Sequence, residues 1–391
     1  MRVLHVNDSL EPIGGIEVYV ENMGKLLKEN EHCVEYLGNN KKDNKKGLIG
    51  WLLRIYNPIS YFRMIKKIKE FKPDIIHYHS LLYLISPSVM HAAKIMKIPS
   101  VITIHDYSII CPNSYFLDDL ELPCKHGFST KCLTQNCWPY RPGLKPKILR
   151  IYRTIKLITH RWIIKNNTDA FLSPSHNLAQ NLKKYLGKNA IITPLFTDFT
   201  PNYTPLNEEN TLLFVGRIAP EKGIKSLIDA MKHVKKEIPD TKLIVVGKGK
   251  YLNKYIQYAK SLGLSPNIYF KGYVDRKQLP ELYQISKIVV IPSIYAENFG
   301  TVGLEAISFG RPIIVSNSFG LIERIHDGKI GKAFKSGNSK ELASLIITML
   351  KDSDSLNQLS INTKKVIKEY SKKRHYNQII EIYRDTIKKY N

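Results

Sequence analysis

The sequence predicts an α/β protein built from two doubly wound domains. Its 391 residues are too many for one hydrophobic core and suit two domains of ordinary size. In both halves, short runs rich in β-branched residues alternate with helix-like patterns, which is typical of βαβ units around a parallel sheet. The stretch 198–207 carries turn formers without periodicity and is the predicted linker.

Four buried strands are predicted in each half. In the first half they lie at 2–7, 74–78, 100–104 and 169–173, and in the second at 212–215, 243–246, 288–291 and 312–315. Helix-like segments follow the strands, so that each half reads as a complete doubly wound unit. We expect domains at 1–197 and 206–370, followed by a last helix within 371–391.

The composition is that of a folded protein with an unusually basic surface. Apolar residues make up 43% and charged residues 24% of the chain, which excludes a disordered polypeptide. The 59 Lys and Arg exceed the 34 Asp and Glu, for a formal net charge of +25. Such a surface attracts nucleic acid, anionic lipid or phosphorylated small molecules. Because both halves share the excess, charge alone does not choose among these partners.

The sequence pattern leads us to expect neither a transmembrane helix nor a secretory leader. No uninterrupted apolar run reaches 18 residues, and Met1 leads directly into a predicted buried strand. We therefore expect a cytoplasmic protein.

The strongest chemical pattern is the run Glu297-Asn298-Phe299-Gly300-Thr301-Val302-Gly303-Leu304-Glu305. A strand ends just before it, and a helix is predicted to start near Thr301. Gly300 allows a close backbone approach, and the helix start offers unpaired N–H groups at the positive end of a dipole. The run therefore predicts a diphosphate cradle with a carboxylate on each side, where paired hydroxyls of a sugar and of a ribose could bind.

This run resembles the signature of the retaining GT-B glycosyltransferases of family 4, also called glycosyl transferases group 1. The resemblance extends to further segments in the same order along almost the whole chain. These segments are 14–15, 103–106, 214–223, 246–249, 270–274 and 305–312. Any one of them is a weak signal, whereas the set is specific.

The resemblance implies a GT-B fold: two facing Rossmann-like doubly wound domains with the active site in the cleft between them. Residues 1–197 would form an N-terminal acceptor-binding domain and 206–370 a C-terminal nucleotide-sugar-binding domain. The helix within 371–391 would cross back to the N-terminal domain. The family is metal-independent, so no cofactor would be required for catalysis.

The resemblance also implies residue roles. Glu297 would hold hydroxyls of the donor sugar and Glu305 the ribose, while Arg217 and Lys222 would neutralise the diphosphate as charge develops on it. His105 would face the sugar. The implied catalytic residues are His105, Glu297, Arg217 and Lys222, and the implied donor-binding residues are Gly14, Gly15, Asn298, Phe299, Gly300, Thr301 and Glu305.

Each of these roles has a structural alternative. Glu305 could be an acid that only stabilises the start of a helix. Arg217 and Lys222 could be surface charges of a very basic protein, and His105 could be a core histidine bonded to the backbone. Gly14 and Gly15 could serve only a turn.

Four cysteines crowd into one aperiodic segment of 111–143: Cys111, Cys124, Cys132 and Cys137. Some thirty residues without periodicity are expected to need a cross-link that stabilises them. In a reducing cytosol, a bound metal ion is a more plausible cross-link than a disulfide. Four thiolates would fit a structural zinc, although no C-x-x-C pair is present. Unligated thiols or a redox-dependent disulfide remain the alternatives.

A strongly basic amphipathic helix is predicted at 145–165, with seven Lys or Arg and no acid. Its apolar stripe is expected to pack on the sheet, and its basic face, with Leu157 and Ile164, is expected to meet anionic lipid. The stripe comprises Ile148, Ile151, Tyr152, Ile155, Ile158, Trp162 and Ile163. Residues 51–72 repeat the pattern. We therefore expect peripheral contact with the inner face of the cell membrane.

Together these observations predict a retaining, metal-independent hexosyltransferase. It would move a hexose-type sugar from a UDP- or GDP-sugar to a glycan or lipid-linked saccharide acceptor during polysaccharide biosynthesis. Two alternatives stay open: a nucleotide-sugar epimerase of the same fold, and a basic nucleic-acid-binding protein.

Overall fold

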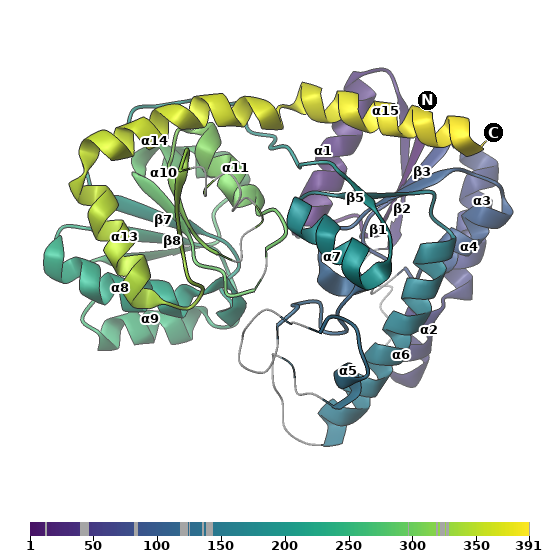
Figure 1. The fold of residues 1–391 in the computed structure, drawn as a ribbon, viewed down its shortest axis with the longest axis horizontal. Coiled ribbons are helices and arrows are strands. Elements are labelled where there is room, and N and C mark those ends of the chain that lie inside the picture. The colour runs from purple at the N-terminus through teal and green to yellow at the C-terminus, as the bar shows by residue number, and fades with distance from the viewer. Residues whose placement is uncertain are drawn as a thin grey trace. The chain divides into compact units, whose positions relative to one another are not determined.

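The computed structural model divides the chain into two compact units (Figure 1). Unit 1 comprises Met1–Leu195 and Lys372–Asn391, and unit 2 comprises Phe196–Ser371. Residues 12–13, 40–46, 82–84, 118–123, 125, 135–136, 138–143, 296, 318–319, 321–324, 326–327 and 391 lie outside the described part of the chain, as do the side chains of 47–48 and 144–146.

Unit 1 is built on a parallel sheet with the strand order β2-β1-β3-β4-β5-β6. The strands are β1 (Arg2–Ser9), β2 (Cys33–Asn39), β3 (Ile75–Tyr78), β4 (Ser100–Thr103), β5 (Ala170–Ser173) and β6 (Ala190–Ile192). The helices are α1 (Gly15–Glu29), α2 (Gly47–Ile55), α3 (Pro58–Phe71), α4 (Ser88–Ile95), α5 (Lys131–Thr134), α6 (Leu144–Asn166), α7 (His176–Leu186) and α15 (Lys372–Tyr390), with a 3-10 turn η2 (Tyr107–Ile109).

Unit 2 is built on a second parallel sheet, with the order β12-β11-β10-β7-β8-β9. Its strands are β7 (Thr211–Val215), β8 (Lys242–Val246), β9 (Ile268–Gly272), β10 (Ile288–Ile291), β11 (Ile313–Ser316) and β12 (Gly331–Phe334). Its helices are α8 (Ile224–Glu237), α9 (Leu252–Ser261), α10 (Leu279–Ile285), α11 (Thr301–Ser308), α13 (Ser339–Lys351) and α14 (Ser353–Val366), with 3-10 turns η3 (Pro220–Lys222), η4 (Arg276–Gln278) and η5 (Ile367–Tyr370).

The two sheets confirm the predicted fold class of two doubly wound, parallel α/β units. All eight strands that the sequence predicts are present. The four that it does not predict, β2, β6, β9 and β12, are the outermost strands of the two sheets. Interior strands such as β3 and β10 are buried along their whole length, and β10 reads as a continuous apolar run. Edge strands such as β9 alternate buried and open positions and lack that signal.

The last helix, α15, packs on unit 1 through buried side chains. Tyr19 and His375 share a hydrogen bond of 2.9 Å, and the Tyr383 hydroxyl shares one of 2.6 Å with His77 Nδ1. Tyr383 is fully buried. The segment that follows unit 2 in sequence is therefore part of the core of unit 1.

Helix α6 lies with the opposite face outward from the one that the sequence predicted. Leu157 and Ile164 are buried, with 2% and 3% of their surface exposed, whereas most of the predicted stripe is open. The basic side chains reach inward: Arg153 donates to Asn113 Oδ1 at 3.0 Å, and Arg161 donates to the Ile109 carbonyl at 3.3 Å. The prediction was wrong because long Arg side chains can cover the protein and still reach polar acceptors.

None of the helices in the described part of the chain has the length and apolar content needed to cross a bilayer.

We expect Tyr383→Phe to lower the free energy of unfolding by about 1–3 kcal/mol, because it leaves His77 Nδ1 buried without its partner. Tyr376→Phe is the matched control on the same helix, since Tyr376 is only half-buried beside His32 and water can replace its hydroxyl. Urea unfolding followed by circular dichroism measures both. Equal losses in the two variants would contradict the role of the His77 contact.

Candidate active site

Unit 2 has a topological switch point between β7 and β10. From β7 the chain adds β8 and β9 on one side, then crosses over and adds β10, β11 and β12 on the other. In open α/β sheets, ligands bind outside the carboxyl ends of the strands at such a point. Arg217 follows β7 directly, and Glu297 lies in the loop that joins β10 to α11. The switch therefore brings together residues that lie 80 positions apart in sequence.

A buried ion pair joins Lys222 to Glu297 at this edge. The Lys222 ammonium donates to Glu297 Oε1, and the two side chains are 20% and 7% exposed. Ser293 Oγ donates to the same carboxylate oxygen at 3.0 Å, and Tyr295 lies 3.2 Å from the ammonium. Burial lowers the pKa of Lys222, but the Glu297 carboxylate raises it more, and the net shift is upward. Lys222 is therefore a fixed cation at neutral pH.

Arg217 is held by a different carboxylate, that of Glu221. Its guanidinium donates to Glu221 Oε1 at 2.7 Å. Glu221 is buried, whereas 60% of the Arg217 side chain is exposed. The anchor fixes one end of Arg217 and leaves the rest of the guanidinium open to a ligand.

Gly223 allows these cations to approach the end of β10. It has a φ of +71°, and a Cβ at this position would lie 1.7 Å from the Pro292 carbonyl oxygen. No other residue fits, because both the left-handed backbone and the contact exclude a side chain. Gly223 thus positions η3, which carries Lys222, against the loop that carries Glu297.

The amino terminus of α11 opens onto the same loop. Gly300 precedes it with a φ of +70°, and no side chain caps the helix. The N–H groups of Thr301 and Val302 therefore have no carbonyl partner within the helix and form an anion-binding end, while the Gly303 N–H donates to the Gly300 carbonyl at 2.9 Å. Asn298 and Phe299 are buried directly before it.

Glu305 lies on α11 and has two partners that the sequence reasoning missed. Its Oε1 accepts from Arg276 at 3.1 Å, and its Oε2 accepts from the Tyr283 hydroxyl at 2.7 Å. Arg276 also forms a two-pronged pair with Asp198. Arg276 directly follows the 270–274 segment of the family resemblance, so its position there was the only available signal.

In unit 1, Gly14 and Gly15 lie where the loop after β1 enters α1. Gly14 has an extended backbone, and a Cβ on it would meet only the end of the flexible Glu17 side chain. A Cβ on Gly15 would have nothing within 4 Å. Neither backbone conformation nor protein packing therefore requires glycine at Gly15.

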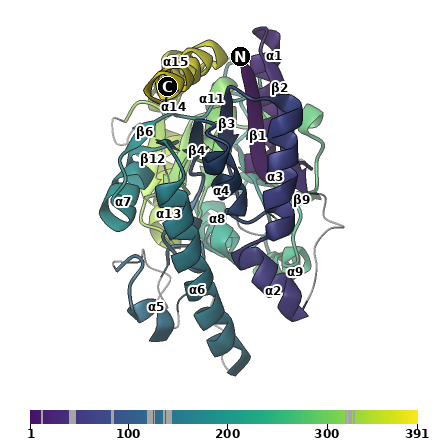
Figure 2. The same cartoon turned by 90° about the vertical axis from the view of Figure 1, so that its right-hand side faces the viewer.

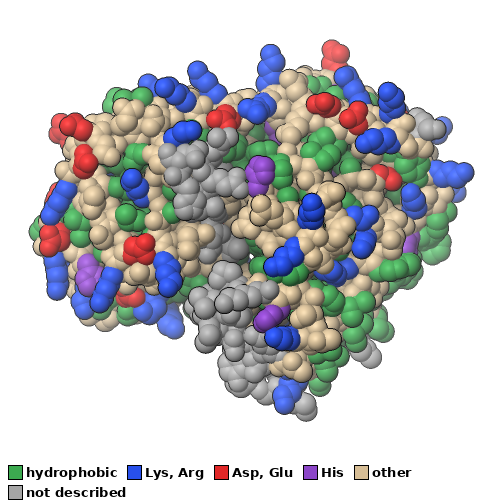
Figure 3. All heavy atoms as spheres, in the orientation of Figure 1, with side chains coloured by type: hydrophobic (Ala, Val, Ile, Leu, Met, Phe, Trp, Pro, Cys, Tyr) green, Lys and Arg blue, Asp and Glu red, His purple; other side chains and the backbone are tan. Residues whose placement is uncertain are grey.

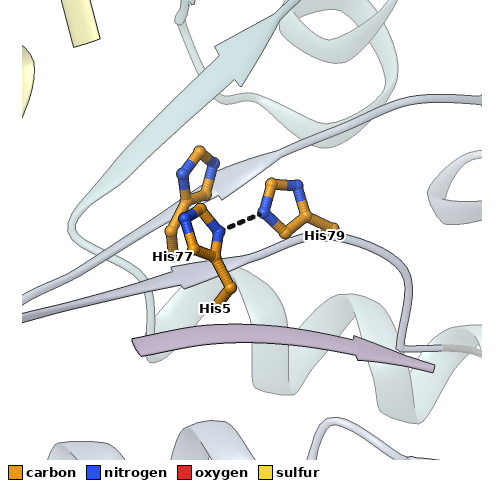
Figure 4. A group of neighbouring side chains, drawn as sticks. All are labelled: His5, His77 and His79. Carbon is orange, nitrogen blue, oxygen red and sulfur yellow. Dashed lines mark hydrogen bonds between the residues drawn. The ribbon is translucent and has the colours of Figure 1, made fainter. Parts of the chain in front are cut away.

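His105 follows β4 and ends a chain of hydrogen-bonded histidines. His5 Nδ1 and His79 Nε2 lie 2.9 Å apart (Figure 4). His79 Nδ1 and His105 Nε2 lie 3.2 Å apart. His5 Nε2 is buried without a hydrogen-bond partner. A proton there would be a stranded donor, so we assign the protons of His5 and His79 to Nδ1. His105 Nε2 then accepts, and its proton lies on Nδ1.

His5, His77 and His79 also have nitrogens within 4.8 Å of one another, close enough to raise the question of a metal. Their rings are stacked or nearly so, with interplanar angles of 20–34°. In-plane lone pairs of near-parallel rings do not converge on one ion. Both nitrogens of His77 are also engaged, with Tyr383 and Thr103. The geometry favours a hydrogen-bonded histidine cluster.

Burial keeps these histidines neutral. It lowers the pKa of His5 and of His105 to about 3, and it lowers the pKa of His77 and of His79 well below the usual value. A neutral His105 can donate or accept a hydrogen bond but carries no positive charge at physiological pH.

A pocket lies next to His105 at the carboxyl edge of the unit 1 sheet. Side chains after β3 and β4, together with α1 and α6, line it, including Ile16, Ser80, His105, Asp106 and Ile164. It combines an apolar wall with a few polar groups, as small-molecule sites do.

Cys111, Cys124 and Cys132 are free thiols. Burial raises the pKa of Cys111 to about 11, with smaller contributions from Cys124 and Cys132 nearby. Among the described residues, no three of these sulfurs come within metal-ligand distance of one another. As placed, the cysteines do not form a tetrahedral zinc site, and the zinc hypothesis stays a prediction.

Comparison with known proteins covers most of the chain. Residues 13–194 match the model of Glycosyltransferase Family 4, and residues 197–366 match that of glycosyl transferases group 1. An uncharacterized glycosyltransferase of Methanocaldococcus jannaschii is 27% identical over 80% of this chain and 79% of its own.

Solved structures show the same fold. Sucrose-phosphate synthase from Thermosynechococcus elongatus aligns with a TM-score of 0.74 at 18% identity, covering 98% of both chains. Anabaena HepE, solved in complex with UDP-glucose, aligns with a TM-score of 0.70 at 19% identity, covering 98% of this chain and all of that one.

We expect unit 1 to lose stability between pH 7 and pH 5. The unfolded chain protonates its histidines below about pH 6.5, whereas buried His5 stays neutral to about pH 3. The unfolded state therefore binds more protons. The free energy of unfolding decreases as the pH is lowered, by about 2 kcal/mol at pH 5 for His5 alone. Urea unfolding read by hydrogen exchange in each unit measures this.

His5→Gln should flatten this pH dependence in unit 1, while His233→Gln, on α8 of unit 2, is the matched control. A pH dependence unchanged by His5→Gln would contradict the assignment.

We expect Glu297→Gln to lower the stability of unit 2 by about 3–5 kcal/mol, because it leaves the buried Lys222 charge uncompensated. Adding Lys222→Met should restore most of the loss. Hydrogen exchange of the β7 and β10 amides in the full chain measures both. Glu209→Gln, which breaks the exposed pair with Lys242, should change stability by less than about 0.5 kcal/mol. A double variant no more stable than Glu297→Gln would refute the coupling.

Proposed function

Since the chain belongs to the GT-B glycosyltransferases of Glycosyltransferase Family 4 and glycosyl transferases group 1, we propose that it transfers a hexose-type sugar from a UDP- or GDP-sugar. The acceptor is a glycan or a lipid-linked saccharide, the anomeric configuration is retained and no metal ion is needed. The observation that carries this proposal is the convergence of two cations, a helix amino terminus and two buried carboxylates on one edge of unit 2.

The diphosphate of the donor fits the cationic part of this edge. When the bond from the sugar to the diphosphate breaks, negative charge develops on the leaving phosphate oxygen. Lys222, Arg217 and the first N–H groups of α11 would stabilise that charge without having to reorganise, which is the most effective form of electrostatic catalysis. These groups supply the positive charge that a magnesium ion would otherwise bring.

The two carboxylates fit the hydroxyl groups at either end of the donor. Glu297 is fixed by Lys222 and Ser293 and would accept hydrogen bonds from the sugar. Glu305 would accept hydrogen bonds from the ribose. Its oxygens already accept from Arg276 and Tyr283, but each carboxylate oxygen has a second lone pair for a ligand. We assign no residue as a nucleophile, and retention rests on the family alone.

In unit 1 we assign phosphate contact to the backbone of Gly14 and Gly15 and sugar contact to His105. The open space at Gly15, which protein packing does not explain, supports the first assignment. The pocket beside His105 and the fixed proton position of that histidine support the second.

We expect the matching nucleotide to raise the melting temperature of the purified protein in EDTA. A ligand at 100 times its Kd stabilises the folded state by about 2.7 kcal/mol. A thermal-shift screen of UDP, GDP, ADP and their sugars would identify the donor class. Glu305→Gln, which keeps a side-chain oxygen for Tyr283, should lose most of the shift, whereas Glu281→Gln, at an exposed position on α10, should keep it.

The reaction products distinguish transfer from the epimerase alternative. Incubation of the stabilising nucleotide-sugar with acceptor saccharides should release free nucleotide diphosphate and a glycosylated product. Free epimerised donor would show an epimerase instead. The absence of a shift with every nucleotide, with or without added zinc, would refute the donor site.

A further inference from the structure

One face of unit 1 exposes an unusual number of large apolar side chains. Eleven of the eighteen large hydrophobic residues that are exposed in the described part of the chain lie on α2, α3, α4 and α6 or at Tyr56 beside them. On soluble proteins, exposed large apolar residues usually lie singly, whereas a contiguous group of them indicates an interaction site. Figure 2 looks onto these four helices.

The exposed residues of α6 form a regular row along the helix. Ile148, Ile151, Ile155, Ile158 and Trp162 follow a spacing of three and four residues, and each is 49–61% exposed. This spacing places all five side chains on one stripe. The opposite side of α6 already supplies the protein core through Leu157, Ile163 and Ile164. The exposed row is therefore not required by the fold of unit 1.

The neighbouring helices extend this row sideways. Trp51 on α2 stacks on Tyr152 of α6, with ring centroids 4.8 Å apart, and the Tyr152 hydroxyl donates to the Trp51 carbonyl. Next to this contact, α2 exposes Ile49 and Leu52. Further along α6, the Trp162 ring packs at a steep angle to His91 on α4, which also contacts Tyr56 just after α2, and α4 exposes Ile95.

We call the exposed residues on these three helices, together with Tyr56, the α2–α6 face. It comprises Ile49, Leu52, Tyr56, Ile95, Ile148, Ile151, Ile155, Ile158 and Trp162. Hydrophobic side chains gather along the lower right edge of Figure 3, where α2 and α6 lie in Figure 1.

The charge around the α2–α6 face is predominantly positive. Helices α2, α3, α4 and α6 contain thirteen Lys or Arg and a single acid, Glu70. Exposed basic side chains lie at both ends of the α6 row, at Lys147 and Lys165, and others lie on α3 and α4 at Lys66 and Lys94. Two copies of such a face would repel each other, whereas an anionic lipid surface would attract it.

We propose that the α2–α6 face inserts its apolar side chains into the headgroup boundary of an anionic bilayer, with the flanking Lys side chains binding lipid phosphates. An apolar stripe bordered by basic residues, lying in the plane of the interface, is the arrangement expected of a peripheral membrane protein. The inference deepens the lipid-linked acceptor of the proposed function. Its test uses no nucleotide, so either proposal can fail alone.

The test is flotation of the full-length protein with vesicles of phosphatidylcholine alone or with about 30% phosphatidylglycerol. We expect binding to the anionic vesicles, weaker binding to the neutral ones, and only partial release by salt, because the apolar insertion is not screened. Ile151→Gln combined with Ile158→Gln should weaken binding at least about tenfold. Both positions are exposed, so the variant should keep the melting temperature of the wild type.

Ile191→Gln combined with Ile361→Gln is the matched control, since these isoleucines are 45% and 44% exposed and lie outside the face. The control should float like the wild type. Equal binding by both double variants, or no binding of the wild type to anionic vesicles, would overturn the proposal. A wild-type dimer that Ile151→Gln and Ile158→Gln dissociate, measured by light scattering, would instead identify the face as a contact between copies of the chain.

Discussion

All strands of a parallel sheet end at one edge, and a reversal of strand order leaves an opening in that edge. The chemistry of unit 2 follows from this constraint. The reversal between β7 and β10 places the loops that carry Arg217, Lys222 and Glu297 next to each other. Helix α11 starts at the same edge and points its free N–H groups toward it. A single topological feature therefore supplies the cations, the dipole and the carboxylates of the proposed donor site.

The charged side chains of this site are held in fixed positions by buried partners. Lys222 and Glu297 compensate each other in a place that water reaches poorly, and Glu305 is held by Arg276 and Tyr283. Partners of this kind keep a buried charge ionised and fix its orientation before a ligand arrives. In unit 1 burial acts in the opposite sense: the histidines have each other as partners and no carboxylate among the contacts described above, so they remain neutral.

Unit 1 also differs from unit 2 in what it leaves exposed. The inward Arg side chains of α6 find carbonyl and amide acceptors in the protein, while a row of isoleucines remains outside. In this orientation the Arg side chains of α6 find hydrogen-bond acceptors within the protein, but the apolar side of the helix stays exposed as a hydrophobic surface. A partner that covers this surface would explain its exposure, and the predominantly positive charge around it favours an anionic partner.

The sequence by itself determined the interior strands and the family, and it predicted the residues of the proposed donor site, because fully buried strands and glycine-rich turns leave local patterns. The tertiary structure decided what depends on neighbours. The edge strands, open on one side, carry no continuous apolar run. Arg276 donates to Glu305 and is itself paired with Asp198, and because these residues come from distant segments, their sequence spacing does not predict the contacts. The outward face of α6 followed from which long side chains could find acceptors within the fold, and helical periodicity is the same whichever side faces inward.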